Sequence, residues 1–164
     1  MERVTGPICD HCGRALEPGD FATSPCRECR VTPPTLCQMR AALRYQEPTS
    51  SLIHRFKYEG CFALAGPLAS SLIAAWPAWE QPPDLIIPIP LHPRRRRRRG
   101  YNQSELLAAP LARALGLPLN ARGLQRVRHT APQVGLGPQE RHDNVRGAFC
   151  RRRRGDWAAR AADR

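Results

Sequence analysis

Two Cys-x-x-Cys pairs near the start of the chain constrain its fold more than any other feature. They are Cys9 with Cys12 and Cys26 with Cys29, separated by 13 residues. Each pair can form a tight turn whose backbone N–H groups point at the sulfurs, and two such turns complete a tetrahedral site of four thiolates. Zinc favours this ligand set. We therefore expect these four cysteines to bind one zinc ion, and four reduced structural cysteines are the alternative.

The expected metal site is closed. Cysteines fill all four positions, so His11, which lies inside the first pair, has no vacant position to occupy. A site without an open position holds a structural ion rather than a catalytic one. The chain has seven cysteines, and five of them precede residue 38. In a reducing compartment such clusters bind metal more often than they form disulfides.

Membrane-targeting patterns are absent from the sequence. No apolar run approaches the roughly 18 residues that a membrane-spanning helix needs. The polar segment Met1–Pro7 leads directly into the first cysteine pair, without the basic and apolar parts of a signal peptide. We therefore expect a cytoplasmic protein that does not insert into a membrane.

The middle of the chain predicts an α/β domain. Apolar residues recur there at helical spacing, and the first and third of these runs have a hydroxyl residue at their start and a glycine after them. We expect three helices, over residues 50–59, 63–75 and 104–115. The segment Asp84–Pro90 is a short apolar run of branched residues, which predicts a buried parallel strand. Pro110 falls inside the third helix and is expected to kink it.

Positive charge is concentrated in the second half of the chain. The protein has 26 Lys and Arg against 14 Asp and Glu, a formal net charge of +12. Residues 1–93 hold 8 basic and 9 acidic side chains, whereas residues 94–164 hold 18 basic and 5 acidic ones. We favour phosphate or nucleic-acid contact over a merely solvated patch for the arginine run. The nucleic-acid candidates are Arg94, Arg95, Arg96, Arg97, Arg98, Arg99 and Tyr101.

Five segments together resemble the ComF family of competence-associated proteins. They are Ile53–Gly60, Asp84–His92, Arg99–Leu107, Thr130–Leu136 and Arg141–Phe149, and they occur in the family's order. The resemblance implies an α/β fold with an incomplete type I phosphoribosyltransferase-like domain, preceded by a zinc ribbon, and a link to DNA uptake. We expect the ribbon and its connector over residues 1–48 and the partial domain over residues 49–149.

The resemblance also implies roles for individual residues. The segment after the expected strand corresponds to a pyrophosphate-binding loop, where backbone amides and arginines can hold phosphate oxygens. The phosphate-binding candidates are Lys57, Pro88, Ile89, Pro90, Leu91, His92, Arg98 and Arg99. A mobile loop that closes over the substrate is expected further along. Its candidates are Arg128, Thr130, Gln133, Arg141 and Asn144.

Several polar residues have a structural alternative to these roles. His92 is either a general acid or base, or a loop residue that makes a hydrogen bond. We expect Asn102 and Gln103 to be cap and turn residues rather than ligands. Lys57 is the one lysine of the chain, and its presence among so many arginines is as compatible with chance as with a phosphate contact.

The family's donor-binding motif has no counterpart in this sequence. Such enzymes hold phosphoribosyl pyrophosphate and magnesium through two adjacent acidic residues and a Thr-Thr-Gly turn, soon after the segment that matches Asn144–Phe149. Residues 150–164 contain neither feature and are strongly basic. We therefore expect weak or no donor and magnesium binding, and a disordered or out-of-frame tail over residues 150–164. A truncated product, one half of a split protein and a genuine short form are the alternatives.

Three functions follow from these features. The first is a ComF-like protein linked to competence and DNA uptake that has no transferase activity as this chain stands. The second is a basic accessory protein that binds nucleic acid, and the third is a zinc-ribbon adaptor that docks a protein. The expected partners are single-stranded DNA or another polyanion, and proteins of the competence machinery.

Overall fold

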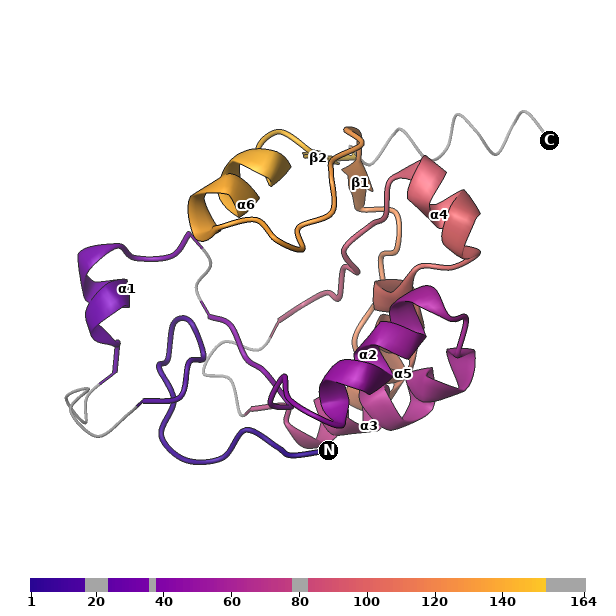
Figure 1. Cartoon of the computed structure of the whole chain (residues 1–164). Coiled ribbons are helices and arrows are strands. Elements are labelled where there is room, and N and C mark those ends of the chain that lie inside the picture. Colours follow the sequence, from indigo (N-terminus) through magenta and orange to yellow (C-terminus); the bar gives the residue numbers. More distant parts are fainter. Residues whose placement is uncertain (17–23, 36–37, 78–82, 153–164) are drawn as a thin grey trace.

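The computed structural model describes residues 1–16, 24–35, 38–77 and 83–152. Its elements, in chain order, are α1 (Arg27–Val31), α2 (Thr49–Tyr58), the 3-10 helix η1 (Phe62–Leu64), α3 (Ala65–Ala74), α4 (Pro93–Arg99), α5 (Gln103–Leu115), β1 (Leu124–Arg126), α6 (Pro138–Val145) and β2 (Phe149–Arg151). Helices α2, α3 and α5 lie together, α4 and the two strands lie above them in the view of Figure 1, and α1 lies on the opposite side. This mixture of helices and a small sheet is compatible with the α/β class.

The three predicted helices are confirmed, and their apolar faces form the main core. Phe56 of α2, Leu68 of α3 and Tyr101, just before α5, make up its buried cluster. Full burial of a Phe or Leu side chain contributes about 1.5–3 kcal/mol. Small buried residues, Ala69 on α3 and Ala108 on α5, let these two helices pack closely. The helical core therefore follows from the local apolar pattern.

Helix α5 begins and ends as the sequence predicts. The Asn102 side chain accepts a hydrogen bond of 3.2 Å from the Ser104 N–H, which confirms the predicted cap. Gly116 ends the helix with a left-handed φ of 66°. The helix runs from Gln103 to Leu115 and continues through Pro110. The packing against α3 compensates for the hydrogen bond that this proline removes.

The buried strand predicted over Asp84–Pro90 is wrong. Ile86 forms a single parallel bridge, with Leu119, and the segment is not part of a strand. The side chains of Leu85, Ile87 and Ile89 are 39%, 43% and 56% exposed. A buried parallel strand needs neighbouring strands on both edges and helices over both faces. The described residues supply only one short bridge here, so alternate apolar side chains face solvent.

The two strands form an antiparallel pair, whereas the family resemblance implies a parallel sheet. Leu124 lies opposite Arg151, and Arg126 lies opposite Phe149. Strand β2 thus continues two residues past the predicted domain boundary at residue 149. Residues 153–164, which make up the rest of the predicted tail, lie outside the described residues.

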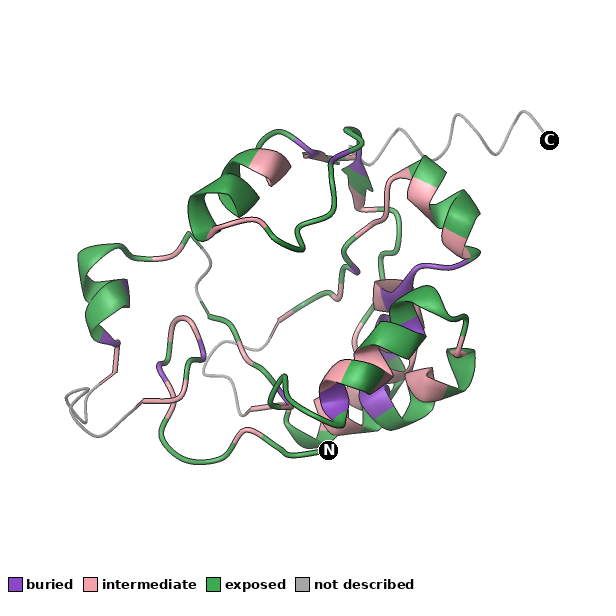
Figure 2. Cartoon of the chain, viewed as in Figure 1, coloured by how far each residue is buried: buried purple, intermediate pink, exposed green. Residues whose placement is uncertain are grey.

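Buried apolar side chains form two clusters, the helical core and the turns that carry the cysteines, and further buried residues such as Arg126 and Ala148 lie at the two strands (Figure 2). The second cluster contains Cys9, Cys26 and Cys29, with Cys12 and Leu16 packed against them. In the part of the chain that the structure describes, every helix is too short or too polar to cross a membrane.

Candidate functional site

The four cysteines of the two pairs converge on one point. Their sulfur atoms all lie within 4.8 Å of one another, and the sulfurs of Cys12 and Cys26 are 3.8 Å apart. A tetrahedral zinc site with Zn–S bonds of about 2.3 Å places its sulfurs about 3.8 Å apart. All four are free thiols rather than disulfides. The cluster of Cys9, Cys12, Cys26 and Cys29 therefore fits a metal ion such as zinc.

Backbone turns aim both cysteine pairs at this point. The Gly13 N–H donates to the Cys9 carbonyl at 2.9 Å and closes the first turn, and the Arg30 N–H donates to the Cys26 carbonyl at 3.1 Å in the second. Gly13 has a φ of +67°, and a Cβ atom there would lie 2.4 Å from the Met39 carbonyl oxygen. Only glycine fits this position, both for its conformation and for its contact.

Burial and hydrogen bonding separate the pKa values of the thiols. Burial raises the pKa of Cys9, but the backbone N–H groups of Cys26, Cys12 and His11 outweigh it and lower the pKa to about 6. Burial, together with hydrogen bonds to the other cysteines, raises the pKa of Cys29 to about 12. Cys9 is therefore a thiolate at neutral pH, and the thiolate is the form that binds metal.

The arginine run forms helix α4, directly after the segment expected to bind pyrophosphate. The Nδ1 atom of His92 accepts a hydrogen bond of 3.3 Å from the Arg94 N–H, so His92 caps the helix. Pro93 occupies the first helical position, and Gly100 ends the helix with a φ of 82°. His92 therefore has the structural role that the sequence left open as an alternative.

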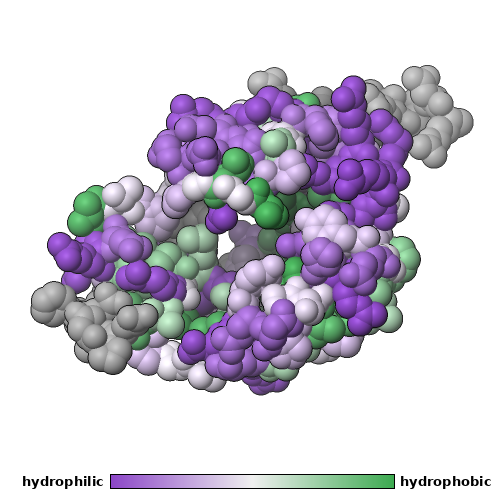
Figure 3. Space-filling view, viewed as in Figure 1, coloured by the Kyte–Doolittle hydropathy of each residue, from purple (hydrophilic) through white to green (hydrophobic). Residues whose placement is uncertain are grey.

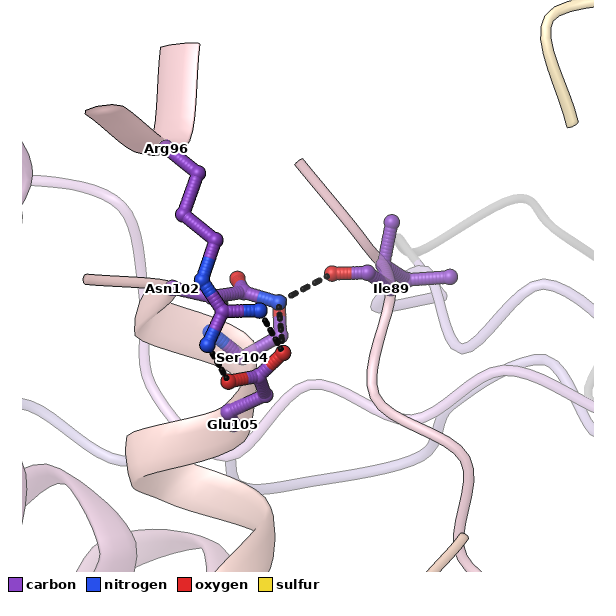
Figure 4. A network of polar contacts seen from close by, with 5 residues as sticks. All are labelled: Ile89, Arg96, Asn102, Ser104 and Glu105. Atoms are coloured by element: carbon purple, nitrogen blue, oxygen red, sulfur yellow. Dashed lines mark hydrogen bonds and ion pairs between the residues drawn. The ribbon is translucent and has the colours of Figure 1, made fainter. Parts of the chain in front are cut away.

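Arg96 belongs to a network that ties α4 to α5 and to the segment before α4 (Figure 4). Its guanidinium donates two hydrogen bonds of 3.0 Å to the Glu105 carboxylate. The Asn102 side chain donates to Glu105 at 3.3 Å and to the Ile89 carbonyl at 3.1 Å. These bonds fix the predicted phosphate-binding segment against the start of α5. Within that segment Pro88 is buried, and Pro90 and Leu91 are half-buried.

Arg99 points toward the end of α2. It donates to the Gln103 side chain at 2.6 Å, and its guanidinium carbon lies 5.0 Å from the centre of the Tyr58 ring. Lys57, next to Tyr58, is exposed, and its side chain makes no hydrogen bond or ion pair with the described residues. The two predicted phosphate ligands at this end of the molecule therefore differ in their contacts. The Arg99 side chain contacts Gln103 and Tyr58, whereas the Lys57 side chain faces solvent.

Three arginines of α4 face solvent together. Arg94, Arg97 and Arg98 are exposed, and none of their side chains makes a hydrogen bond or an ion pair with a described residue. Helix positions i, i+3 and i+4 lie on one face. We call Arg94, Arg97 and Arg98 the arginine face. The space-filling view shows strongly hydrophilic surface over α4 (Figure 3).

A second cationic cluster surrounds Thr130, which is buried. Arg95 donates to the Thr130 carbonyl at 3.0 Å, and Arg126 donates to its hydroxyl. Arg126 is 8% exposed, and its Nε atom has no hydrogen-bond partner among the described residues. Burial, followed by the charges of Arg95 and Arg128, lowers the pKa of Arg126. A buried guanidinium without an acidic partner is costly, and a bound anion would reduce that cost.

His92 and His129 lie beside this cluster, with their ring centres 5.1 Å apart. Burial, followed by the positive charges of His129, Arg94, Arg126 and Arg97, lowers the pKa of His92. Arg126 and His129 were not among the residues predicted from sequence. The alternation of Arg126, Arg128 and Thr130 in extended chain could have indicated Arg126, but no motif marks His129.

The predicted mobile-loop residues are divided between two places. Arg128 donates to the Asn144 carbonyl at 3.0 Å, and the Asn144 side chain donates to the Ala131 carbonyl at 3.1 Å. Asn144 and Arg141 lie in helix α6 rather than in a loop. Gln133 and Arg141 are exposed. Arg128 and Asn144 thus anchor the loop to α6, and no described contact joins Gln133 to Arg141.

Tyr101 belongs to the core and not to the surface. It is buried, its hydroxyl donates to the Phe56 carbonyl, and its ring centre lies 4.4 Å from that of Phe62. A nucleic-acid base has no free face of this ring to stack on. The structure therefore replaces the predicted nucleic-acid contact with a packing role.

The chain is similar to proteins named for competence and DNA utilization. Competence protein F of Haemophilus influenzae is 36% identical over 148 residues, which are 87% of this chain and 63% of that protein. DNA utilization protein YhgH of Salmonella typhimurium is 35% identical over 147 residues, which are 87% and 63% of the two chains. Competence protein ComFC of Bacillus subtilis is 29% identical over 126 residues, which are 73% and 51%. These identities, which extend over most of the chain, support its assignment to the ComF family.

The chain spans less than two thirds of the length of these curated relatives. No family model matches it, and no solved structure does. Its membership therefore rests on identity along the sequence, which extends over most of the chain.

Proposed function

We propose that this ComF chain acts in competence and DNA uptake by binding single-stranded DNA through the arginine face. The observation that carries the proposal is the division of α4, whose three free arginines lie on one face while the others bind protein groups. Arginines that neutralise phosphates release counterions, which makes binding strong at low salt. The names of the relatives, for competence and DNA utilization, support the same role.

Salt dependence tests this proposal. Each phosphate contact on a single strand contributes about −0.7 to the slope of log affinity against log salt. Replacing Arg94, Arg97 and Arg98 together by serine should lower the magnitude of that slope by about 2 and weaken binding. A labelled oligonucleotide titrated by fluorescence anisotropy at several salt concentrations measures both quantities.

A control variant removes the same charge from other surfaces. Arg27, Arg113 and Arg122 are exposed, lie outside α4 and can be replaced by serine together. The control chain should keep nearly the parental slope, because only three specific phosphate contacts are proposed. Equal losses in both triple variants would show that net charge alone attracts DNA and would overturn the arginine face as the site.

A small phosphate compound is a second candidate ligand, and Arg126 favours it. The buried guanidinium has an Nε atom without a partner among the described residues, and it lies among other cationic groups near His92. We propose that inorganic pyrophosphate binds there and that Arg126→Met abolishes this binding in calorimetry. Because the paired acids and Thr-Thr-Gly turn are absent, we expect phosphoribosyl pyrophosphate with magnesium to bind no more tightly than pyrophosphate and no transferase activity to appear.

The proposed architecture is a zinc ribbon over residues 1–48 followed by part of a phosphoribosyltransferase-like domain over residues 49–149. The cysteine cluster supports the first part, with zinc as the ion that stabilises it. The parallel bridge of Ile86 with Leu119 supports the second part, since α4 and α5 connect the two segments as a crossover would.

A further inference from the structure

Two aromatic side chains are exposed beside the C-terminal end of α4. Tyr58, the last residue of α2, is 53% exposed, and Phe62, the first residue of η1, is 56% exposed. Aromatic rings are usually covered in folded proteins, because covering each ring removes a large apolar area from water. The Arg99 guanidinium lies over the Tyr58 ring, so Tyr58 lies at the C-terminal end of α4, next to the arginine face. The close approach of α2 and α4 at their C-terminal ends is visible in Figure 1.

We propose that Tyr58 and Phe62 form a base-stacking platform, so that a strand whose phosphates contact the arginine face lays unpaired bases on these rings. This inference rests on the proposed function and deepens it, because stacking requires single-stranded nucleic acid. Basic grooves that track the backbone, combined with aromatic rings that accept successive bases, are the general design of single-strand binders. Tyr101 cannot supply this ring, because it is buried.

Each ring keeps part of its surface free. The Phe62 ring contacts Tyr101 on one side, with its centre 4.4 Å away and the planes at 60°. The Tyr58 ring has Arg99 on one side and the His54 ring 4.9 Å away, tilted by 46°. These contacts orient both rings, and more than half of each residue remains open to solvent.

The charges around the rings favour a polyanion over an apolar protein surface. The Arg99 guanidinium makes a cation–π contact with the Tyr58 ring, and Lys57 and Arg98 are the exposed sequence neighbours of these two residues. Glu59 is the nearby acidic residue in the sequence, and it forms an ion pair with Arg55 at 3.3 Å and lies 3.4 Å from the His54 Nδ1 atom. A nucleic acid that binds here therefore contacts positive charges and exposed aromatic rings at the same time.

Matched oligonucleotides test the platform in the full chain. The probes are a labelled thymidine oligonucleotide and an abasic strand of the same length, which carries the same phosphates but no bases. The parent should bind the thymidine strand more tightly than the abasic strand. Phe62→Leu keeps an apolar side chain and Tyr58→Ala removes the ring, and each should weaken binding of the thymidine strand by about 5- to 100-fold. Both variants should bind the abasic strand like the parent.

Two further chains complete the design. Tyr58→Phe keeps the ring and should retain binding, and Val134→Ala, at another exposed apolar residue, should change nothing. Circular dichroism verifies that each chain folds. Equal binding of both strands by the parent, with a normal salt slope, would overturn the platform and leave the arginine face intact. Binding of neither strand would overturn both proposals. Unchanged binding in F62L and Y58A would also overturn the platform and assign the rings to a protein partner.

Discussion

Four cysteines and six arginines each form a cluster of one residue type, but the fold treats them in opposite ways. The cysteines are separated along the chain, yet their sulfurs meet within 4.8 Å of one another. The arginines of α4 are consecutive, yet they diverge, since three bind protein groups and three face solvent. Tight turns bring together residues that are far apart in the sequence, whereas helical periodicity points consecutive side chains in different directions. Spacing matched to local geometry, rather than density of a residue type, therefore indicates a shared site.

The largest effect is expected where the residues converge. Cys26→Ser removes one ligand of a closed site, and structural zinc contributes on the order of 10–16 kcal/mol to folding in small zinc modules. The parent should contain about one zinc per chain by elemental analysis, and C26S should contain none and lose order around the cysteines. Cys150→Ser, at an exposed cysteine outside the cluster, is the control. Full zinc content in C26S would contradict a four-cysteine site.

A smaller effect is expected from the turn that aims the first pair. Gly13→Ala forces a left-handed residue and brings a Cβ atom 2.4 Å from the Met39 carbonyl oxygen. Residues held in such conformations cost about 1–3 kcal/mol, and the clash adds to this. Gly6→Ala shares a positive φ of +90° but has open space around its Cβ, so it isolates the conformational part. Urea unfolding of the metal-loaded chains measures the difference, and equal losses would show that the Met39 contact is unimportant.

The two sets of arginines should differ in stability by a modest amount. Arg96→Ala removes a bidentate ion pair with the partly buried Glu105 and should cost about 1 kcal/mol. Arg97→Ala should change the free energy of unfolding by less than about 0.5 kcal/mol, because its side chain binds no described group. Urea unfolding again measures both. A destabilisation by R97A as large as that by R96A would break the division between bound and free arginines.

The smallest effect concerns pH. The pKa of His92 is lowered in the folded chain, first by burial and then by neighbouring positive charges, so the unfolded chain takes up this proton first as pH falls. Stability should therefore decrease as pH drops below about 6.5, the ordinary value for histidine. His92→Asn keeps an acceptor for the Arg94 N–H but cannot titrate. The drop in melting temperature between pH 7 and pH 5.5 should be smaller in H92N, and an identical drop would exclude His92 as a contributor.

Features that depend on neighbouring residues in the sequence could be predicted. The helices follow from apolar periodicity with caps such as Asn102, and the cysteine cluster follows from the spacing of its pairs. The helical form of the arginine run was also readable, since Pro93 at its start and Gly100 at its end are typical helix boundaries.

Features that depend on distant residues could not be predicted. The composition of Asp84–Pro90 indicates a strand, but its burial depends on partners elsewhere, and Ile87 and Ile89 are exposed. That Arg126 has no acidic partner among the described residues is likewise a property of the assembled fold. The exposed rings of Tyr58 and Phe62 become relevant only because α4 ends beside them.

The six like charges of α4 have a consequence for how the protein responds to ions. The six guanidinium groups of this seven-residue helix repel one another. Hydrogen bonds from three of its arginines to Glu105, Thr130 and Gln103 stabilise the helix against this repulsion. Added salt screens the repulsion and should therefore stabilise α4, but it also weakens the attraction between α4 and the phosphates of a nucleic acid. Raising the ionic strength should thus increase the stability of the protein and lower its affinity for nucleic acid. A bound polyanion should neutralise the arginine charges and stabilise the folded chain.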